Sequence, residues 1–98
     1  MNLHKTSCVE YHPVGVVGAI VPWNYPAHNI FNPLIAATFA GNAIVIKASE
    51  YAAWSTQYYQ RALDECLRLG GAPAGLIQIV NGFAPTGAVM RAYKLYKL

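Results

Sequence analysis

The sequence predicts an α/β fold, namely a partial Rossmann-like parallel sheet of about three strands with crossover helices. Three short segments rich in Val and Ile alternate with two longer segments of helical periodicity. The first of these segments is continuously apolar rather than alternating, as in a strand that helices cover on both faces of a parallel sheet. Because the connections are short, we expect right-handed crossovers between neighbouring strands.

The three predicted strands are residues 14–21, 43–47 and 76–80. The first ends at Pro22, since proline has no N–H to donate to a neighbouring strand. After the third strand, a turn over residues 82–87 is expected, with a short helix beginning near Thr86. Residues 91–98 give no readable pattern.

The two predicted helices are residues 29–40 and 52–69. Pro33 falls in the first turn of the first helix, where a missing N–H breaks no hydrogen bond. Gly41 and Asn42 end that helix, because both residue types tolerate the left-handed conformation of a C-cap. In the second helix Leu63 and Cys66 belong to a set of apolar residues at helical spacing, so both are predicted to face the core.

Composition predicts that residues 1–98 are a fragment of one domain, with no second domain. Of the 98 residues 55% are hydrophobic and 11% are charged, against about 25% charged in an average domain. So much apolar side chain on a short chain indicates a piece of a larger core. The net charge of +3 is scattered rather than gathered in a basic stripe, so no nucleic-acid partner is expected.

A metal site and a membrane span are not predicted either. Cys8 and Cys66 show no zinc-ligand spacing. Although a disulfide between them stays open, two unclustered cysteines suit a reducing compartment, so we expect an intracellular, cytoplasmic protein. No Asp, Glu, Lys or Arg lies between Glu10 and Lys47, but prolines and asparagines interrupt that stretch, which argues against a transmembrane segment.

Residues suited to binding a ligand follow each predicted strand, among them polar residues, glycines and one Pro-Trp pair. In an open parallel sheet, ligands bind beyond the carboxyl ends of the strands, so these residues are expected to meet at one edge. Those that follow the three strands in turn are Pro22, Trp23 and Asn24, then Lys47 and Glu50, then Gly82 and Gly87.

Each group has two interpretations. Nearby prolines make the backbone around Asn24 rigid, which suits a carboxamide that stabilises an oxyanion, but the local pattern alone favours a turn asparagine bonded to its own backbone. Lys47 and Glu50 can bond a diol such as ribose, or form a surface ion pair of little value. Gly82 and Gly87 suit a phosphate, although the Lys-Ser/Thr of a P-loop does not follow them.

Taken together, these residues resemble the aldehyde dehydrogenase superfamily over about residues 10–90. Three blocks carry the resemblance: Pro-Trp-Asn-Tyr-Pro at 22–26, Ala-Gly-Asn at 40–42 leading to Lys-Ala-Ser-Glu at 47–50, and Asn-Gly at 81–82 through Gly87. The first two blocks at this spacing are highly specific, whereas two glycines alone are weak. Ala48 departs from the family, which usually has proline there.

The resemblance implies a role for each block. Asn24 matches the carboxamide that helps to hold the oxyanion of a thiohemiacetal. Lys47 and Glu50 match residues that bind the adenosine ribose, and because a carboxylate at Glu50 would repel a 2′-phosphate, NAD is expected rather than NADP. The wall of the cofactor cleft is matched by Ile20, Pro22 and Trp23, and the glycine-x-x-x-x-glycine turn near the cofactor by Gly82 and Gly87.

The resemblance also implies that the parent protein is a homo-oligomeric, NAD(P)-dependent oxidoreductase that converts an aldehyde to a carboxylic acid. The family's cysteine nucleophile and its water-activating glutamate lie downstream of this region, and neither Cys8 nor Cys66 matches the nucleophile. We therefore expect the fragment alone to be inactive, and poorly soluble because a three-stranded sheet leaves an edge unpaired. The alternative is a stand-alone nucleotide-binding or interaction module without catalysis.

Overall fold

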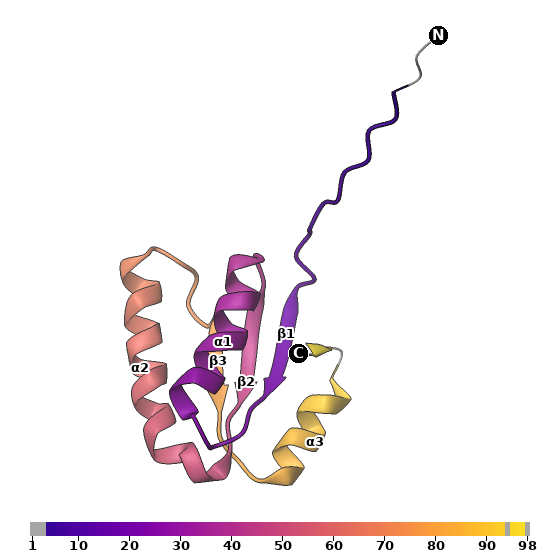
Figure 1. Ribbon diagram of the computed structural model, residues 1–98. Helices are drawn as coiled ribbons and strands as arrows, with labels where there is room; N and C mark the ends of the chain where they lie inside the picture. The colour runs from indigo at the N-terminus through magenta and orange to yellow at the C-terminus, as the bar shows by residue number, and fades with distance from the viewer. Residues whose placement is uncertain (1–3, 94, 98) are drawn as a thin grey trace.

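The computed structural model describes residues 4–93 and 95–97, in which helices and strands alternate (Figure 1). In order they are β1 (Val16–Ile20), α1 (Pro26–Phe39), β2 (Ala43–Lys47), the 3-10 turn η1 (Glu50–Ala52), α2 (Ala53–Leu69), β3 (Ile77–Val80), α3 (Ala84–Ala92) and β4 (Tyr96–Lys97). The predicted α/β class with parallel strands is confirmed. The chain before β1 runs away from the sheet as an extended segment (Figure 1).

The strands form one sheet in the order β3-β2-β1-β4, and every neighbouring pair is parallel. β1 and β2 are the central strands, paired from Val16 opposite Ala43 to Ile20 opposite Lys47. The expectation of about three strands missed β4, which lies in the segment 91–98 and pairs with β1 over two residues. Such a short strand has too few residues for a readable pattern.

Alternate residues of each strand point to opposite faces of the sheet. The buried residues of one face pack against α1 and α2 and form the core: Val17, Ala19, Ile30, Leu34, Ala37, Ile44, Ile46, Leu63 and Ile77. α3 covers the other face, where Gly18 of β1 lies against the side chain of Met90. A Cβ atom at Gly18 would stand 3.1 Å from Met90 Cε, so this glycine permits the close approach of α3.

Two helices begin earlier than predicted. α1 begins at Pro26 rather than at residue 29, because Pro26 supplies the first-turn proline and Pro33 lies inside the helix. α3 begins at Ala84, so Gly87 lies in a helix and not in a turn. Within residues 4–93 and 95–97, no helix is long and apolar enough to cross a bilayer.

The prediction that Cys66 faces the core is wrong, because its side chain is exposed. α2 packs beside the edge strand β3, and only a narrow stripe of the helix meets the sheet. Thr56 and Leu63 are its buried residues, and Tyr59 and Leu67 are partly buried beside them. Cys66 falls outside this stripe.

The side chain of Asn42 is buried and joins the start of β1 to the end of α1. Its Oδ1 accepts hydrogen bonds from the N–H groups of Val14 (2.6 Å) and Gly15 (3.0 Å). Its Nδ2 donates to the carbonyl of Ala37 (3.2 Å). Of the two residues predicted to end the helix, Gly41 has the left-handed conformation and Asn42 acts through its carboxamide.

The outer edge of β3 is covered by a side chain from α2. β3 pairs with β2 through the carbonyls of Leu76 and Val80, so the peptide groups of Ile77 and Ile79 face outward. Gln60 Nε2 donates to the carbonyl of Ile77 (3.1 Å), and Gln60 Oε1 accepts from the N–H of Ile79 (2.7 Å). A neighbouring parallel strand would make the same two hydrogen bonds. The Gln60 carboxamide therefore satisfies part of the strand edge that was expected to be unpaired.

Replacing Gln60 by alanine should therefore expose the edge of β3. In the full-length protein, Gln60→Ala is expected to speed amide hydrogen exchange at Ile79 about fivefold, the value of one lost hydrogen bond. Gln57→Ala is the matched control, because among the described residues the Gln57 side chain bonds to the carbonyl of Trp54 in its own helix and not to β3. Equal exchange at Ile79 in both variants would contradict the edge-closing role.

Candidate functional site

The candidate site lies at the carboxyl edge of the sheet, where β1 and β4 are neighbours. α1, which follows β1, covers one face, and α3, which precedes β4, covers the other. In open α/β sheets, ligands bind outside the carboxyl ends of the strands at such a change of face. The residues that follow β1, β2 and β3 all emerge at this edge (Figure 1).

After β1, the chain supplies an exposed segment with one oriented carboxamide. Trp23 is 59% exposed and packs edge-on against Tyr51, with ring centroids 6.4 Å apart. Asn29 Nδ2 donates to Asn24 Oδ1 and to the carbonyl of Pro22, each at 3.3 Å. Because the oxygen of Asn24 is engaged, its NH₂ group is directed away from Asn29 and can serve as a donor.

Asn29 is a functional candidate that sequence reasoning missed. The sequence pattern indicates Asn29 only as the first residue of a helix, whereas the residue lies in the first turn of α1 and bonds back to the preceding loop. The two asparagines five residues apart, on either side of Pro26, were the available signal. Beside them a hollow of ≈ 380 Å³ opens against β1, lined by Ala19, Ile20, Val21, Pro22, Asn29, Asn32, Pro33 and Ala36.

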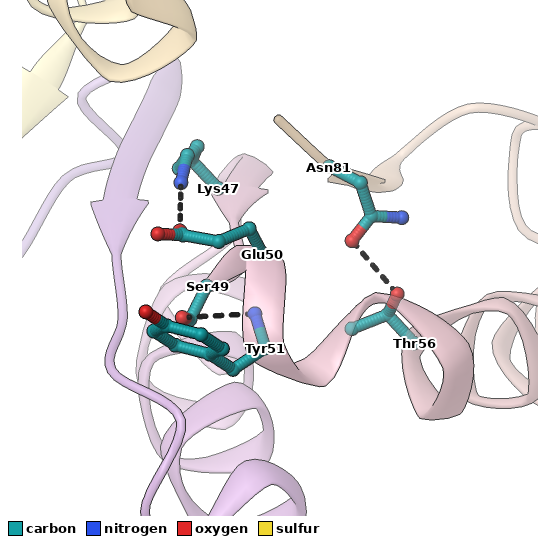
Figure 2. Close-up of polar contacts among 6 residues, drawn as sticks. All are labelled: Lys47, Ser49, Glu50, Tyr51, Thr56 and Asn81. Carbon is teal, nitrogen blue, oxygen red and sulfur yellow. Dashed lines mark hydrogen bonds and ion pairs between the residues drawn. The ribbon is translucent and has the colours of Figure 1, made fainter. Parts of the chain in front are cut away.

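After β2, Lys47 and Glu50 form an ion pair that Figure 2 shows with its surroundings. Lys47 Nζ lies 3.7 Å from Glu50 Oε2, and the side-chain exposures are 7% and 36%. The pair differs from an ordinary surface ion pair, because the Lys47 side chain is only 7% exposed. Ser49 accepts a hydrogen bond from the N–H of Tyr51 (3.3 Å), which starts η1 and turns Glu50 back towards Lys47.

Ala48 supplies a backbone donor at the position where the family that the sequence resembles usually has proline. Its N–H bonds to the carbonyl of Val80 at 3.1 Å, which proline cannot do. This departure extends the pairing of β2 and β3 by one hydrogen bond beyond Lys47.

After β3, the two glycines predicted to lie at the site, Gly82 and Gly87, have different backbone conformations and different surroundings. Gly82 has φ +151°, and a Cβ atom there would collide with the side chain of Thr86. Gly87 is buried within α3, where an added Cβ would stand 3.7 Å from Ile20 Cδ1, an ordinary contact. They are not two ends of one turn, although both lie near the carboxyl edge.

A second contact at this edge was not predicted from the sequence. Thr56 Oγ1 donates to Asn81 Oδ1 at 2.9 Å, which links α2 to the residue that follows β3 (Figure 2). A further apolar hollow of ≈ 330 Å³ lies between the sheet and α3, on the face to which Lys47 belongs. Its lining residues are Val45, Val80, Thr86, Val89, Met90, Tyr93 and Leu95.

Neither cysteine lies at the carboxyl edge. Both are exposed and unbridged, with Cys8 on the extended segment before β1 and Cys66 in the last turns of α2, at the opposite edge (Figure 1). Beside Cys66, the hydrogen bond from Arg68 holds the pKa of Glu65 below its ordinary value. Among the described residues, no group of three His, Cys, Asp or Glu could hold a metal ion.

The two glycines should respond differently to alanine. Gly82→Ala is expected to destabilise the full-length protein by about 1–3 kcal/mol, because alanine disfavours this backbone conformation and its Cβ meets Thr86. Gly87→Ala should change stability by no more than about 1 kcal/mol, since alanine favours the helix. Thermal melts of both variants test this, and equal losses would show that the backbone at Gly82 is not special.

Comparisons with known proteins give a consistent result. A family model described as "Aldehyde dehydrogenase family" matches residues 1–94. An aldehyde dehydrogenase-like protein of Schizosaccharomyces pombe is 47% identical over 81 residues, which is 83% of this chain and 16% of that protein. One of Saccharomyces cerevisiae is 41% identical over 86 residues, or 88% of this chain and 13% of that protein.

A human relative is more distant in sequence. Retinaldehyde dehydrogenase 3 of Homo sapiens is 36% identical over 85 residues, covering 86% of this chain and 16% of that protein. The chain therefore spans about one sixth or less of the length of these relatives.

Proposed function

The chain belongs to the aldehyde dehydrogenase family, and we propose that the full-length protein oxidises an aldehyde to a carboxylic acid with NAD. The observation that supports the proposal is that the oriented carboxamide of Asn24 and the Lys47–Glu50 pair follow neighbouring parallel strands at the same end of the sheet. The intracellular location and the homo-oligomeric state expected from the sequence belong to the same proposal.

The ion pair fits the hydroxyl groups of a ribose. A separation of 3.7 Å between Lys47 Nζ and Glu50 Oε2 exceeds hydrogen-bond length, so both groups keep capacity for another partner. A vicinal diol can accept from the ammonium and donate to the carboxylate. The sheet fixes Lys47 and η1 fixes Glu50, so little side-chain entropy is lost when the diol binds.

The other predicted residues surround this pair. In the proposal, Ile20, Pro22 and Trp23 form the wall of the cofactor cleft. Gly82 and Gly87 let the start of α3 approach the cofactor phosphates, where a helix N-terminus favours negative charge. A bound nicotinamide supplies the two-electron acceptor for the oxidation.

Asn24 is proposed to act on the substrate. A carboxamide NH₂ held by Asn29 can donate to the oxygen that gains negative charge when a nucleophile attacks an aldehyde. The nucleophile belongs to another part of the protein, because Cys8 and Cys66 lie away from this edge.

The reaction itself tests the proposal. The full-length protein should produce NADH from NAD with members of an aldehyde panel, whereas the 98-residue chain alone should give none. Asn24→Ala should lower kcat by about 10²–10³-fold, the usual value of an oxyanion donor, and Gln57→Ala on the outer side of α2 serves as control. Cofactor binding by the full-length protein without turnover of any aldehyde would favour the binding-module alternative.

Cofactor choice gives a second test. A carboxylate beside the ribose repels a 2′-phosphate by about 1–3 kcal/mol at intermediate dielectric. Glu50→Gln should therefore weaken NAD modestly and reduce the discrimination against NADP, while Lys47→Ala should weaken both cofactors. Dissociation constants for NAD and NADP measure this, with Glu65→Gln at the opposite edge as control. An unchanged NAD/NADP ratio in Glu50→Gln would place Glu50 away from the ribose.

A further inference from the structure

We propose that Thr56 is a positioning residue of the cofactor site, because its buried hydroxyl holds Asn81 and so fixes where α3 begins. This inference rests on the proposed function, since it assigns α3 and its preceding loop to the cofactor. Thr56 lies on α2. Its hydroxyl contacts Ala53 and Asn81, neither of which is proposed above to bind cofactor or substrate.

The hydroxyl of Thr56 has a partner that its own burial does not require. Thr56 is 1% exposed, and its single hydroxyl proton is shared between two acceptors, the carbonyl oxygen of Ala53 and Asn81 Oδ1, each 2.9 Å from Oγ1. A helical threonine is satisfied by a carbonyl of the preceding turn alone. Thr38 of α1 is such a case, with Oγ1 donating to the carbonyl of Leu34 at 2.8 Å.

Asn81 is therefore the residue that gains from the contact. It follows β3 directly, is itself exposed, and precedes Gly82 with its φ of +151°. The next helix has no side-chain cap, since Phe83 occupies its N-cap position. The hydrogen bond to Thr56 ties this loop to a packed helix at the point where the loop leaves the sheet.

The position of α3 matters at the carboxyl edge. Gly87 of α3 lies against Ile20, the last residue of β1, and Ile20 is proposed to line the cofactor cleft. If the loop at Asn81 loosens, the start of α3 loses its fixed place relative to Ile20. Cofactor affinity should fall, whereas the reacting groups near Asn24 stay in place.

The test uses the full-length protein with Thr56→Val, which removes the hydroxyl and keeps the shape. Thr56→Val should raise the KM and the Kd for NAD about fivefold with little change in kcat, and should speed amide exchange over residues 82–87. Thr56→Ser should restore both values, because serine keeps the hydroxyl. Thr38→Val makes the same chemical change on α1 and should leave both values unchanged.

Asn81→Ala removes the other partner from an exposed position and is expected to fold. It should match Thr56→Val, and the double variant should be no worse than either single one, because one hydrogen bond cannot be lost twice. Additive losses of NAD affinity, or a Thr56→Val protein that melts earlier with NAD affinity and exchange unchanged, would overturn the proposal.

Failure of the proposed function would look different. If the wild-type protein does not bind NAD, the function proposed above is wrong, and amide exchange over residues 82–87 still decides whether Thr56 holds α3. Faster amide exchange over residues 82–87 in both Thr56→Val and Asn81→Ala, but not in Thr38→Val, would support that role. Unchanged exchange in the two variants would refute it.

Discussion

Asn42 joins three parts of the chain through one buried carboxamide, and the arrangement of the sheet depends on it. The oxygen holds the N–H groups of Val14 and Gly15 before β1, and the NH₂ holds the carbonyl of Ala37 in α1. The next residue, Ala43, donates to the carbonyl of Gly15 and starts β2. The entry to β1, the end of α1 and the start of β2 are thus fixed together, which sets the register of the two central strands.

The main elements could be predicted because their signals are local. The strand Ala43–Lys47 was predicted with its observed bounds, since Asn42 before it and polar residues after it bracket a continuous apolar run. β4 could not be predicted, because its two residues form a strand only through pairing with β1. The place of Gly87 in a helix had a local signal, because a proline lies in the first turn of α3, which begins at Ala84.

The residues of the candidate site also fall into a group that the sequence could predict and a group that it could not. Residues that directly follow strands were predictable, because the parallel topology alone brings Asn24, Lys47 and Gly82 to one edge. Their supporting residues were not. Thr56 meets a partner 25 residues away in sequence, and nothing local to Thr56 indicates that contact. The burial of Lys47 was equally invisible, since a charged residue at a strand end is usually solvated.

The pairing register of β1 and β2 also decides on which face of the sheet the Lys47 side chain lies. Lys47 ends the central strand, where its carbonyl accepts from the N–H of Val21 and the following N–H donates to the carbonyl of Val80. A slip of one residue would move the ammonium to the face covered by α1 and α2. It would lie there among apolar side chains without Glu50, where a buried charge is costly. The hydrogen bonds of Asn42 that set the register therefore also set where Lys47 can bind a ligand.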